Sequence, residues 1–299
     1  METKSIIERS DVQPEPADRS DDELRARLRG MWAAVAPGWA EHAAYADARG
    51  AEVAETMLAL TLPQPGERVL ELACGTGGLG LAAAERLAPG GEVVLSDVVA
   101  ELTAIAAARA AALGLTNATT RELDLEQIDE PDASYDVVLC REGLMFVPDP
   151  ARAARELNRV LRPGGRFAVA VWGPREHNPW LGVVFDAVSA QIGALVPPPG
   201  VPGPFSLADP DRLSRLFSDA ALTDVAVTDK DVPMRAVSFE DWWERTCALA
   251  GPLAKMLASL SEEAKQAIRA RAQEAVRVYE TPTGMEFPGV TLLASGRHA

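Results

Sequence analysis

Residues Val69-Leu70-Glu71-Leu72-Ala73-Cys74-Gly75-Thr76-Gly77-Gly78-Leu79-Gly80 form a short apolar run that leads into a cluster of glycines. The apolar run predicts a buried parallel strand, and the residues from Leu79 onward predict a helix. Glycine permits positive φ angles and leaves no side chain between backbone and ligand, so this turn is typical of a nucleotide site. The glycine spacing also fits G-x-G-x-x-G, a pattern shared by NAD and FAD sites and by chance glycine clusters.

Two acidic residues favour one kind of nucleotide over the others. Glu71 lies within the predicted strand, and its carboxylate would repel the pyrophosphate of a dinucleotide. S-adenosylmethionine (SAM) carries a sulfonium and an ammonium instead of a phosphate, so an acid beside the turn is favourable. Asp97 ends the next apolar run, about twenty residues after the glycines, where a carboxylate can accept hydrogen bonds from both ribose hydroxyls.

Composition limits the class of protein. The 299 residues suffice for one large α/β domain with an appended lid or for two small domains, and 47% of them are hydrophobic. The net charge of −15 is a poor match for nucleic acids and for anionic membranes. No apolar run approaches the ~20 residues that span a bilayer, and the polar N-terminus lacks the apolar core of a signal peptide. Three cysteines without metal-ligand spacing predict a reduced, cytoplasmic protein with no metal site.

The order of strands and helices predicts the domain organisation. Apolar strands alternate with helical patterns between residues 51 and 173, which predicts a parallel sheet with right-handed crossovers. The pattern loosens after Gly173, where a loop rich in proline and glycine is followed by further helices and strands. We expect a flexible tail (1–20), an N-terminal helical cap starting near Asp21 or Asp22 (21–50), a Rossmann-like core (51–173), a loop, helix and strand that complete the sheet (174–236), a helical lid (237–285), and a last strand and tail (286–299).

Three segments together identify a family. They are Glu71-Leu72-Ala73-Cys74-Gly75-Thr76-Gly77, Asp136-Val137-Val138-Leu139-Cys140-Arg141 and Val160-Leu161-Arg162-Pro163-Gly164-Gly165, in an order and spacing that fit one nucleotide-binding core. In these segments the chain resembles class I SAM-dependent methyltransferases, especially the group that includes the ubiquinone/menaquinone C-methyltransferases (type 11). The resemblance implies an α/β Rossmann-like fold with seven strands in the order 3-2-1-4-5-7-6, strand 7 antiparallel, and a helical lid inserted before that strand.

The resemblance also implies the residues that bind SAM. Backbone of the glycine turn would hold the methionine part, with Glu71 behind it, and Asp97 would hold the ribose. Two positions, Val98 and Leu125, would contact the adenine through packing and a backbone amide. The full set of implied cofactor-binding residues is Trp39, Glu71, Ala73, Gly75, Thr76, Gly77, Asp97, Val98, Asp124, Leu125 and Arg141, with Tyr45 as the alternative to Trp39 for covering the cofactor.

Catalytic residues are harder to assign. Methyl transfer from a sulfonium is an in-line displacement in which the protein mainly aligns donor and acceptor, although an oxygen or carbon acceptor usually also needs a base. Of the three histidines, only His177 is expected near the rim of the site, where it could act as a base, but a solvated loop histidine is the favoured interpretation. Glu142 is a second candidate, with an ion pair to Arg141 as the alternative. The catalytic residues therefore remain unassigned at this stage.

Several interpretations stay open on sequence alone. Trp242 and Trp243 fit either an aromatic acceptor pocket or ordinary packing in the lid, and Cys74 and Cys140 are best explained as small buried residues. The function that we predict is methyl transfer to the oxygen, carbon or nitrogen of a small molecule. The alternatives are an NAD(P)-dependent oxidoreductase, for which no Tyr-x-x-x-Lys motif is present, and a SAM-binding protein without catalysis.

Overall fold

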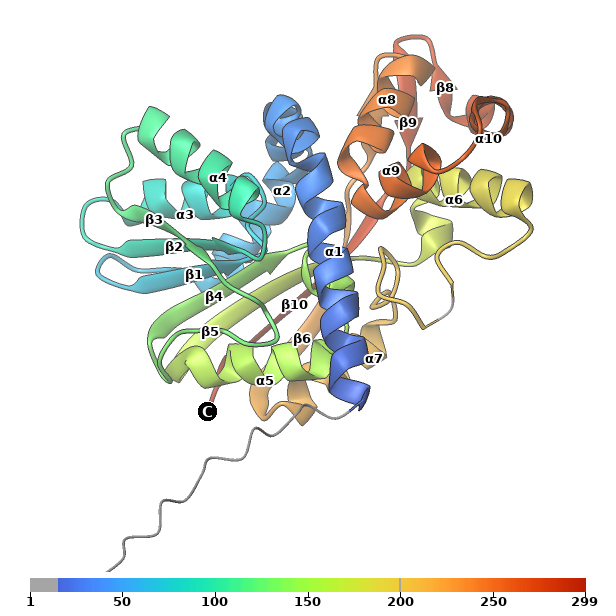
Figure 1. Cartoon of the computed structure of the whole chain (residues 1–299). Helices are drawn as coiled ribbons and strands as arrows, with labels where there is room; N and C mark the ends of the chain where they lie inside the picture. The colour runs from blue at the N-terminus through green and yellow to red at the C-terminus, as the bar shows by residue number, and fades with distance from the viewer. Residues whose placement is uncertain (1–15, 199) are drawn as a thin grey trace, which may run out of the picture.

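The computed structural model describes residues 16–198 and 200–299, with side chains from residue 23 onward. A seven-stranded sheet forms its centre, with the strand order β3-β2-β1-β4-β5-β10-β6 (Figure 1). The last strand, β10, is antiparallel to both of its neighbours, and the predicted order with an antiparallel last strand is confirmed. The strands are β1 (Arg68–Leu72), β2 (Glu92–Asp97), β3 (Ala118–Glu122), β4 (Tyr135–Arg141), β5 (Leu161–Trp172), β6 (Leu222–Asp231) and β10 (Val290–His298).

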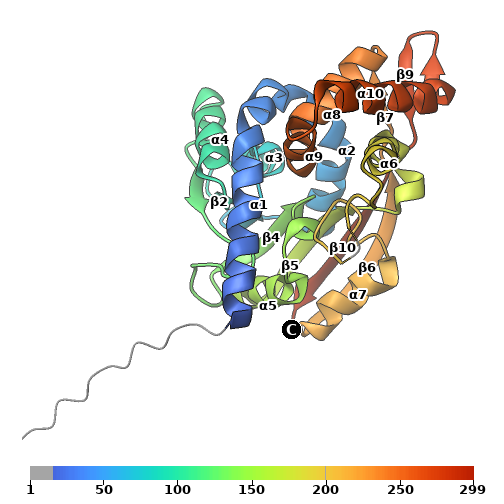
Figure 2. The ribbon, with the colours of Figure 1, turned by 45° about the vertical axis from the view of Figure 1, so that its right-hand side comes forward.

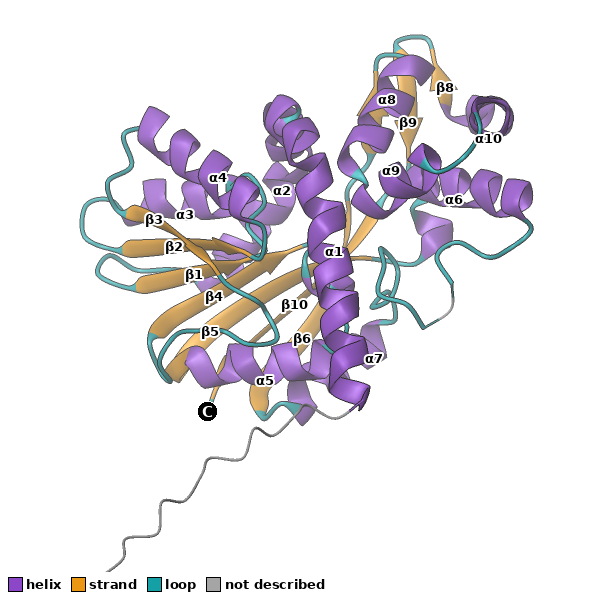
Figure 3. Ribbon diagram, viewed as in Figure 1, coloured by secondary structure: helices purple, strands orange, loops and turns teal. Residues whose placement is uncertain are grey.

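Helices cover both faces of this sheet, which explains why β1 is buried at every position after Arg68 (Figure 3). Leu70 and Leu72 belong to one buried cluster, and Val69 belongs to the cluster on the opposite face. Burying both faces of a parallel sheet in this way removes the alternation expected of a half-exposed strand. The first face is covered by α5 (Pro150–Val160) and α7 (Pro210–Asp219), and the second by α2 (Ala43–Thr61), α3 (Gly78–Leu87) and α4 (Ala100–Ala112).

The remaining elements lie beyond the carboxyl ends of the strands. Helix α1 (Pro16–Glu41) crosses this end of the sheet in both views (Figures 1 and 2). Beside it stands a unit that we call the lid, which has its own apolar cluster around Trp242, Ile268 and Phe287. The lid consists of α6 (Pro179–Ile192), β7 (Met234–Ala236), α8 (Phe239–Leu249), α9 (Gly251–Ala258), α10 (Glu262–Val276), β8 (Glu280–Thr281) and β9 (Gly284–Phe287). The described residues also include the short helical turns η1 (Leu144–Phe146), η2 (Arg175–His177) and η3 (Arg277–Tyr279), the last of which joins α10 to β8.

The structure differs from the expected segments in four places. In the segment 174–236, which was expected to complete the sheet, α6 and β7 instead belong to the lid. Helix α1 begins at Pro16, before the expected start at Asp21 or Asp22, while residues 1–15 of the expected tail lie outside the described residues. The lid is not purely helical, because β7, β9 and β8 form a small sheet within it. The helical part of the lid is divided into separate helices. Pro252 in the first turn of α9 and Ser261 at the N-cap of α10 are both residues that favour the start of a new helix.

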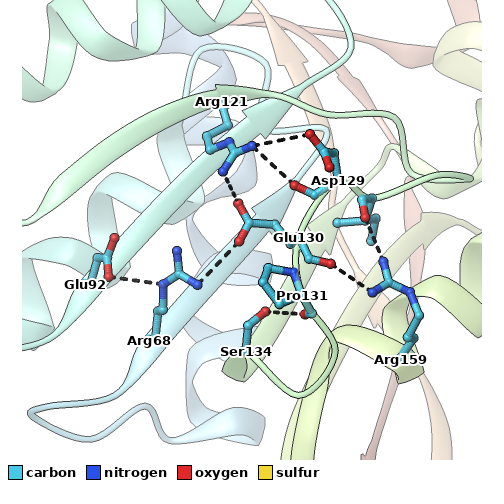
Figure 4. Close-up of polar contacts among 9 residues, drawn as sticks. Arg68, Glu92, Arg121, Asp129, Glu130, Pro131, Ser134 and Arg159 are labelled. Carbon is cyan, nitrogen blue, oxygen red and sulfur yellow. Dashed lines mark hydrogen bonds and ion pairs between the residues drawn. The ribbon is translucent and has the colours of Figure 1, made fainter.

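A buried glutamate holds the connection between β3 and β4 (Figure 4). The carboxylate of Glu130 accepts hydrogen bonds from Arg121 at 2.5 Å and from Arg68 at 3.4 Å, and its side chain is only 3% exposed. The carbonyl of the same residue accepts a hydrogen bond from Arg159 at the end of α5. One residue therefore ties two strands and a helix together, away from the glycine turn. Among the helices of residues 16–198 and 200–299, none combines the length and the apolar character needed to cross a bilayer.

Candidate active site

Gly75 and Gly77, in the turn after β1, lack a side chain for different structural reasons. Gly75 and Gly77 both have positive φ angles, of 55° and 87°. A Cβ atom at Gly75 would meet no other atom within 4 Å, and the residue lines a large cavity at the carboxyl end of the sheet. A Cβ atom at Gly77 would instead lie 3.1 Å from the side chain of Ala106 on α4. Gly75 thus leaves room for a ligand, whereas Gly77 allows helix and turn to pack closely.

Glu71 supports the turn from beneath. Its Oε2 atom accepts a hydrogen bond from the backbone amide of Gly80 at 2.8 Å, and a Cβ atom at Gly80 would overlap with this oxygen. The side chain is almost fully buried, and burial raises the pKa of this carboxyl to about 8, against the opposing effect of the Arg141 guanidinium. The acid in the strand therefore anchors the first turn of α3, and it also borders the cavity.

Asp97 joins the end of β2 to the glycine turn. Its Oδ2 atom accepts a hydrogen bond from the amide of Gly75, and its Oδ1 atom accepts one from the amide of Val99, each at 3.0 Å. Burial raises the pKa of the carboxyl to about 6, although both amides favour the charged form. A carboxylate oxygen has more than one lone pair, so these bonds leave Asp97 able to accept from a ligand.

The cavity brings together most of the predicted cofactor residues. Thr76 and Gly77 do not border it: Thr76 is buried, and its carbonyl accepts a hydrogen bond from Arg109 at 2.6 Å. Tyr45, the alternative to Trp39, borders the cavity together with it. The predicted residues that do border the cavity are Trp39, Glu71, Ala73, Gly75, Asp97, Val98, Asp124, Leu125 and Arg141.

Trp39 connects α1 to the lid beside the cavity. Its indole Nε1 donates a hydrogen bond to the carbonyl of Leu249 at 3.1 Å, which links α1 to the last residue of α8 in the lid. The ring also borders the cavity. Trp39 can therefore cover a bound ligand and hold the lid against α1 at the same time.

Arg141 and Glu126 also belong to the polar lining of the cavity. The guanidinium of Arg141 lies against Gly50 on α2. A Cβ atom at this position would overlap with the guanidinium, so the glycine makes room for the arginine. Glu126 borders the cavity two residues after Asp124 and is not among the predicted residues. It accepts hydrogen bonds from Arg25 at 3.0 Å and from the amide of Asp149 at 2.7 Å. The only signal for it in the sequence is its position beside another acid.

Of the candidates for a catalytic base, only Glu142 borders the cavity. His42, His177 and His298 all lie within the described residues, and none borders the cavity. Glu142 does border it, but the expected pair with Arg141 is wrong, because the carboxylate binds Arg49 of α2 at 2.6 Å. Sequence reasoning missed Arg49, which lies in the N-terminal part of the chain, 93 residues away.

The tryptophan pair Trp242 and Trp243 and the cysteines Cys74 and Cys140 contribute to packing. Trp242 is fully buried in the lid and donates a hydrogen bond to the carbonyl of Trp180 at 3.0 Å, and neither Trp242 nor Trp243 borders the cavity. This pair therefore packs the lid. Cys74 and Cys140 are buried, and burial raises the pKa of both thiols well above the ordinary range, to about 12 for Cys140. Neither is suited to react as a thiolate near neutral pH.

Comparisons with known proteins agree with this geometry. A family model described as a methyltransferase domain matches residues 63–180. Nocamycin O-methyltransferase of Saccharothrix syringae is 31% identical over 207 residues, which cover 65% of this chain and 74% of that protein. An uncharacterized protein of Mycobacterium tuberculosis H37Rv is 36% identical over 154 residues, and the chain spans about half the length of this relative, with 52% of this chain and 53% of that one covered.

A solved structure shares the fold. The YcgJ protein of Bacillus subtilis aligns with a TM-score of 0.56 at 21% identity, and the match covers 82% of this chain and 97% of that one. The coverage includes more than the segment that the family model matches, so the similarity extends beyond the glycine turn. The chain therefore belongs to the class I SAM-dependent methyltransferases.

Proposed function

We propose that this protein transfers the methyl group of SAM to a small-molecule acceptor by in-line displacement. The observation that carries the proposal is the single cavity in which an acid-lined glycine turn faces a wall of apolar side chains from α1, β5 and the lid. The first part suits a cationic nucleoside, and the second suits an organic acceptor beside it. The atom that receives the methyl group is an oxygen, carbon or nitrogen of this acceptor.

The residues at the turn fit SAM better than a dinucleotide. Asp97, Asp124 and Glu126 border the same cavity as Gly75, so carboxylates lie beside the place where a pyrophosphate would have to lie. The same groups favour a sulfonium and an ammonium. Gly75 leaves open space beside them, as a ligand held by the backbone requires. SAM, when bound, supplies a methyl group that is already activated for transfer.

The chain's own contribution is positioning and the exclusion of water. Helix α1 and the lid meet over the cavity through Trp39, and most of the surrounding side chains are apolar. Holding two reactants in line can supply up to ~7–11 kcal/mol of the barrier, and a dry site strengthens every electrostatic contact in it. A cavity with this lining fits a small molecule rather than a nucleic acid, and the three free cysteines fit a reducing, cytoplasmic location.

The proposal is tested first by binding. Calorimetry of the purified protein should show saturable binding of SAM and of S-adenosylhomocysteine, and much weaker binding of NADH. Tighter binding of NADH than of SAM would instead support the oxidoreductase alternative. In a second step, the protein is incubated with methyl-labelled SAM and a metabolite extract. Label in a small product supports methyl transfer, whereas binding without any transfer supports a SAM-binding protein that does not catalyse.

A further inference from the structure

A row of aromatic rings forms one wall of the cavity. Seven of the chain's 16 aromatic residues border it, although aromatic residues are only 5% of the sequence. Trp32 and Phe146 have ring centroids 4.8 Å apart, Phe146 and Trp172 6.4 Å, and Trp172 and Trp180 4.8 Å, each pair edge to face. Aromatic rings offer large flat contact surfaces with little conformational entropy to lose, which suits a planar partner.

A charged pair rests on this wall. The guanidinium carbon of Arg49 lies 5.8 Å from the ring centroid of Trp172 and 5.5 Å from that of Trp180. Arg49 binds Glu142 at 2.6 Å, and the two side chains are only 14% and 11% exposed. The carboxylate of Glu142 is therefore held in a defined place beside the aromatic row, in a largely dry environment.

Glu142 is also held close to the glycine turn. A Cβ atom at the next residue, Gly143, would overlap with the Cβ atom of Ala73, so the loop after β4 and the turn after β1 touch directly. Glu142 itself has a φ angle of 60°, which is unfavourable for a residue with a side chain. Backbone strain of this kind is maintained by the surrounding structure and is concentrated at functional sites.

We propose that the methyl acceptor is a planar aromatic compound with a hydroxyl group, and that Glu142 is the base that receives its proton. This inference rests on the proposed function. The acceptor ring would lie against Phe146, Trp172 and Trp180, and its hydroxyl would donate to the oxygen of Glu142 that is not bound to Arg49. The hydroxyl proton passes to Glu142 as the acceptor oxygen forms its bond to the methyl carbon. The carbon–sulfur bond breaks with its electron pair going to sulfur, and the products are a methyl ether and S-adenosylhomocysteine.

The placement of Glu142 can be measured without turnover. The probe is 4-nitrophenol, bound to the protein saturated with S-adenosylhomocysteine, and its absorbance shows when it becomes a phenolate. A carboxylate beside the hydroxyl disfavours a second negative charge, so the bound probe should ionise at a lower pH in Glu142→Gln than in the wild type, by about one pH unit. The matched control is Glu67→Gln, which removes the charge of a glutamate paired with Arg166 at 2.7 Å outside the cavity. It should leave the titration of the probe unchanged.

The aromatic wall is tested by the affinity for the same probe. Trp172→Leu should weaken the binding of 4-nitrophenol at least tenfold, while Trp243→Leu, which alters a lid tryptophan that does not border the cavity, should not. Cyclohexanol, which has a ring of similar size that is not planar, should not displace the probe. Both variants should still bind S-adenosylhomocysteine as the wild type does.

Three results would overturn the inference. One is a protein that binds S-adenosylhomocysteine but not 4-nitrophenol, and another is equal probe affinity in the two tryptophan variants. The third is the same probe titration in the wild type and Glu142→Gln, which would show that the carboxylate does not face the hydroxyl. Failure to bind SAM or S-adenosylhomocysteine at all would count against the proposed function instead.

Discussion

The backbone amide of Gly75 donates a hydrogen bond to Oδ2 of Asp97 at 3.0 Å, which joins the turn after β1 to the end of β2. The same carboxylate is predicted to hold the ribose of SAM. The shape of the turn and the capacity to bind the sugar therefore depend on one group. Because burial raises the pKa of Asp97 to about 6, the protonation state of this group changes within an accessible pH range.

We expect the affinity for SAM to fall as the pH drops below about 6. In this range the Asp97 carboxyl becomes protonated in the free protein, so it loses negative charge and hydrogen-bond acceptors. Calorimetry between pH 5 and pH 8 measures the effect. Asp97→Asn should bind SAM at least tenfold more weakly at pH 8 and show little of this pH dependence. The control Asp136→Asn alters an aspartate outside the cavity and should keep the wild-type profile. A flat profile in the wild type would contradict the role of Asp97.

Glu71 should make the protein less stable as the pH rises, whereas a carboxylate in an ordinary ion pair makes a protein less stable as the pH falls. Its pKa is about 8 in the folded protein and near the ordinary value when unfolded, so folding favours the protonated form. The stability associated with this proton is fully present below the ordinary pKa and is lost as the pH rises through about 8. Glu71→Gln, which can still accept the hydrogen bond from Gly80, removes this loss. Its melting temperature should exceed that of the wild type by a few degrees at pH 8, by less at pH 6, and not at all near pH 4.5. A constant difference across this range would contradict the prediction.

The core was predictable because its signals are local. The apolar runs of β1, β2 and β4, the glycine turn and the acids at the strand ends lie within short segments, and the parallel topology places those ends at one edge of the sheet. The aromatic wall was not predictable in this way. Phe146, Trp172 and Trp180 come from different elements, and no local pattern shows that they converge. The pair of Arg49 with Glu142 is equally non-local, so the nearer Arg141 appeared to be the partner.

The distinction between the glycines can be tested by matched substitutions. Gly75→Ala and Gly114→Ala both place a side chain at a positive φ angle, 55° and 69°, where the added Cβ atom meets nothing within 4 Å. Each should destabilise the protein by about 1 kcal/mol. Only Gly75 borders the cavity, so only Gly75→Ala should weaken SAM binding, by at least tenfold in calorimetry. Equal SAM affinities of the two variants would show that the ligand does not approach the backbone at Gly75.

The network around Glu130 should contribute to stability and not to binding (Figure 4). Glu130→Gln leaves Arg121 and Arg68 facing a neutral amide, although Arg68 keeps its contact with Glu92. Both arginines are partly exposed, which reduces the cost, and we expect a loss of roughly 1–3 kcal/mol in the free energy of unfolding. Urea denaturation measures this loss. SAM affinity should stay within twofold of the wild type, and a larger change would mean that the network shapes the cavity.

Finally, the bond between Trp39 and Leu249 should control how long SAM stays bound. Trp39→Phe keeps an aromatic ring at the cavity but removes the indole donor that links α1 to α8. A hydrogen bond of this kind contributes about 1 kcal/mol, so the dissociation of SAM should become roughly 3- to 10-fold faster, with a smaller effect on association. Stopped-flow displacement by excess S-adenosylhomocysteine measures the rate. Trp243→Phe serves as control, because its ring packs against Phe239 within the lid and does not border the cavity. If both variants release SAM at the wild-type rate, the link between α1 and α8 does not hold the cavity closed.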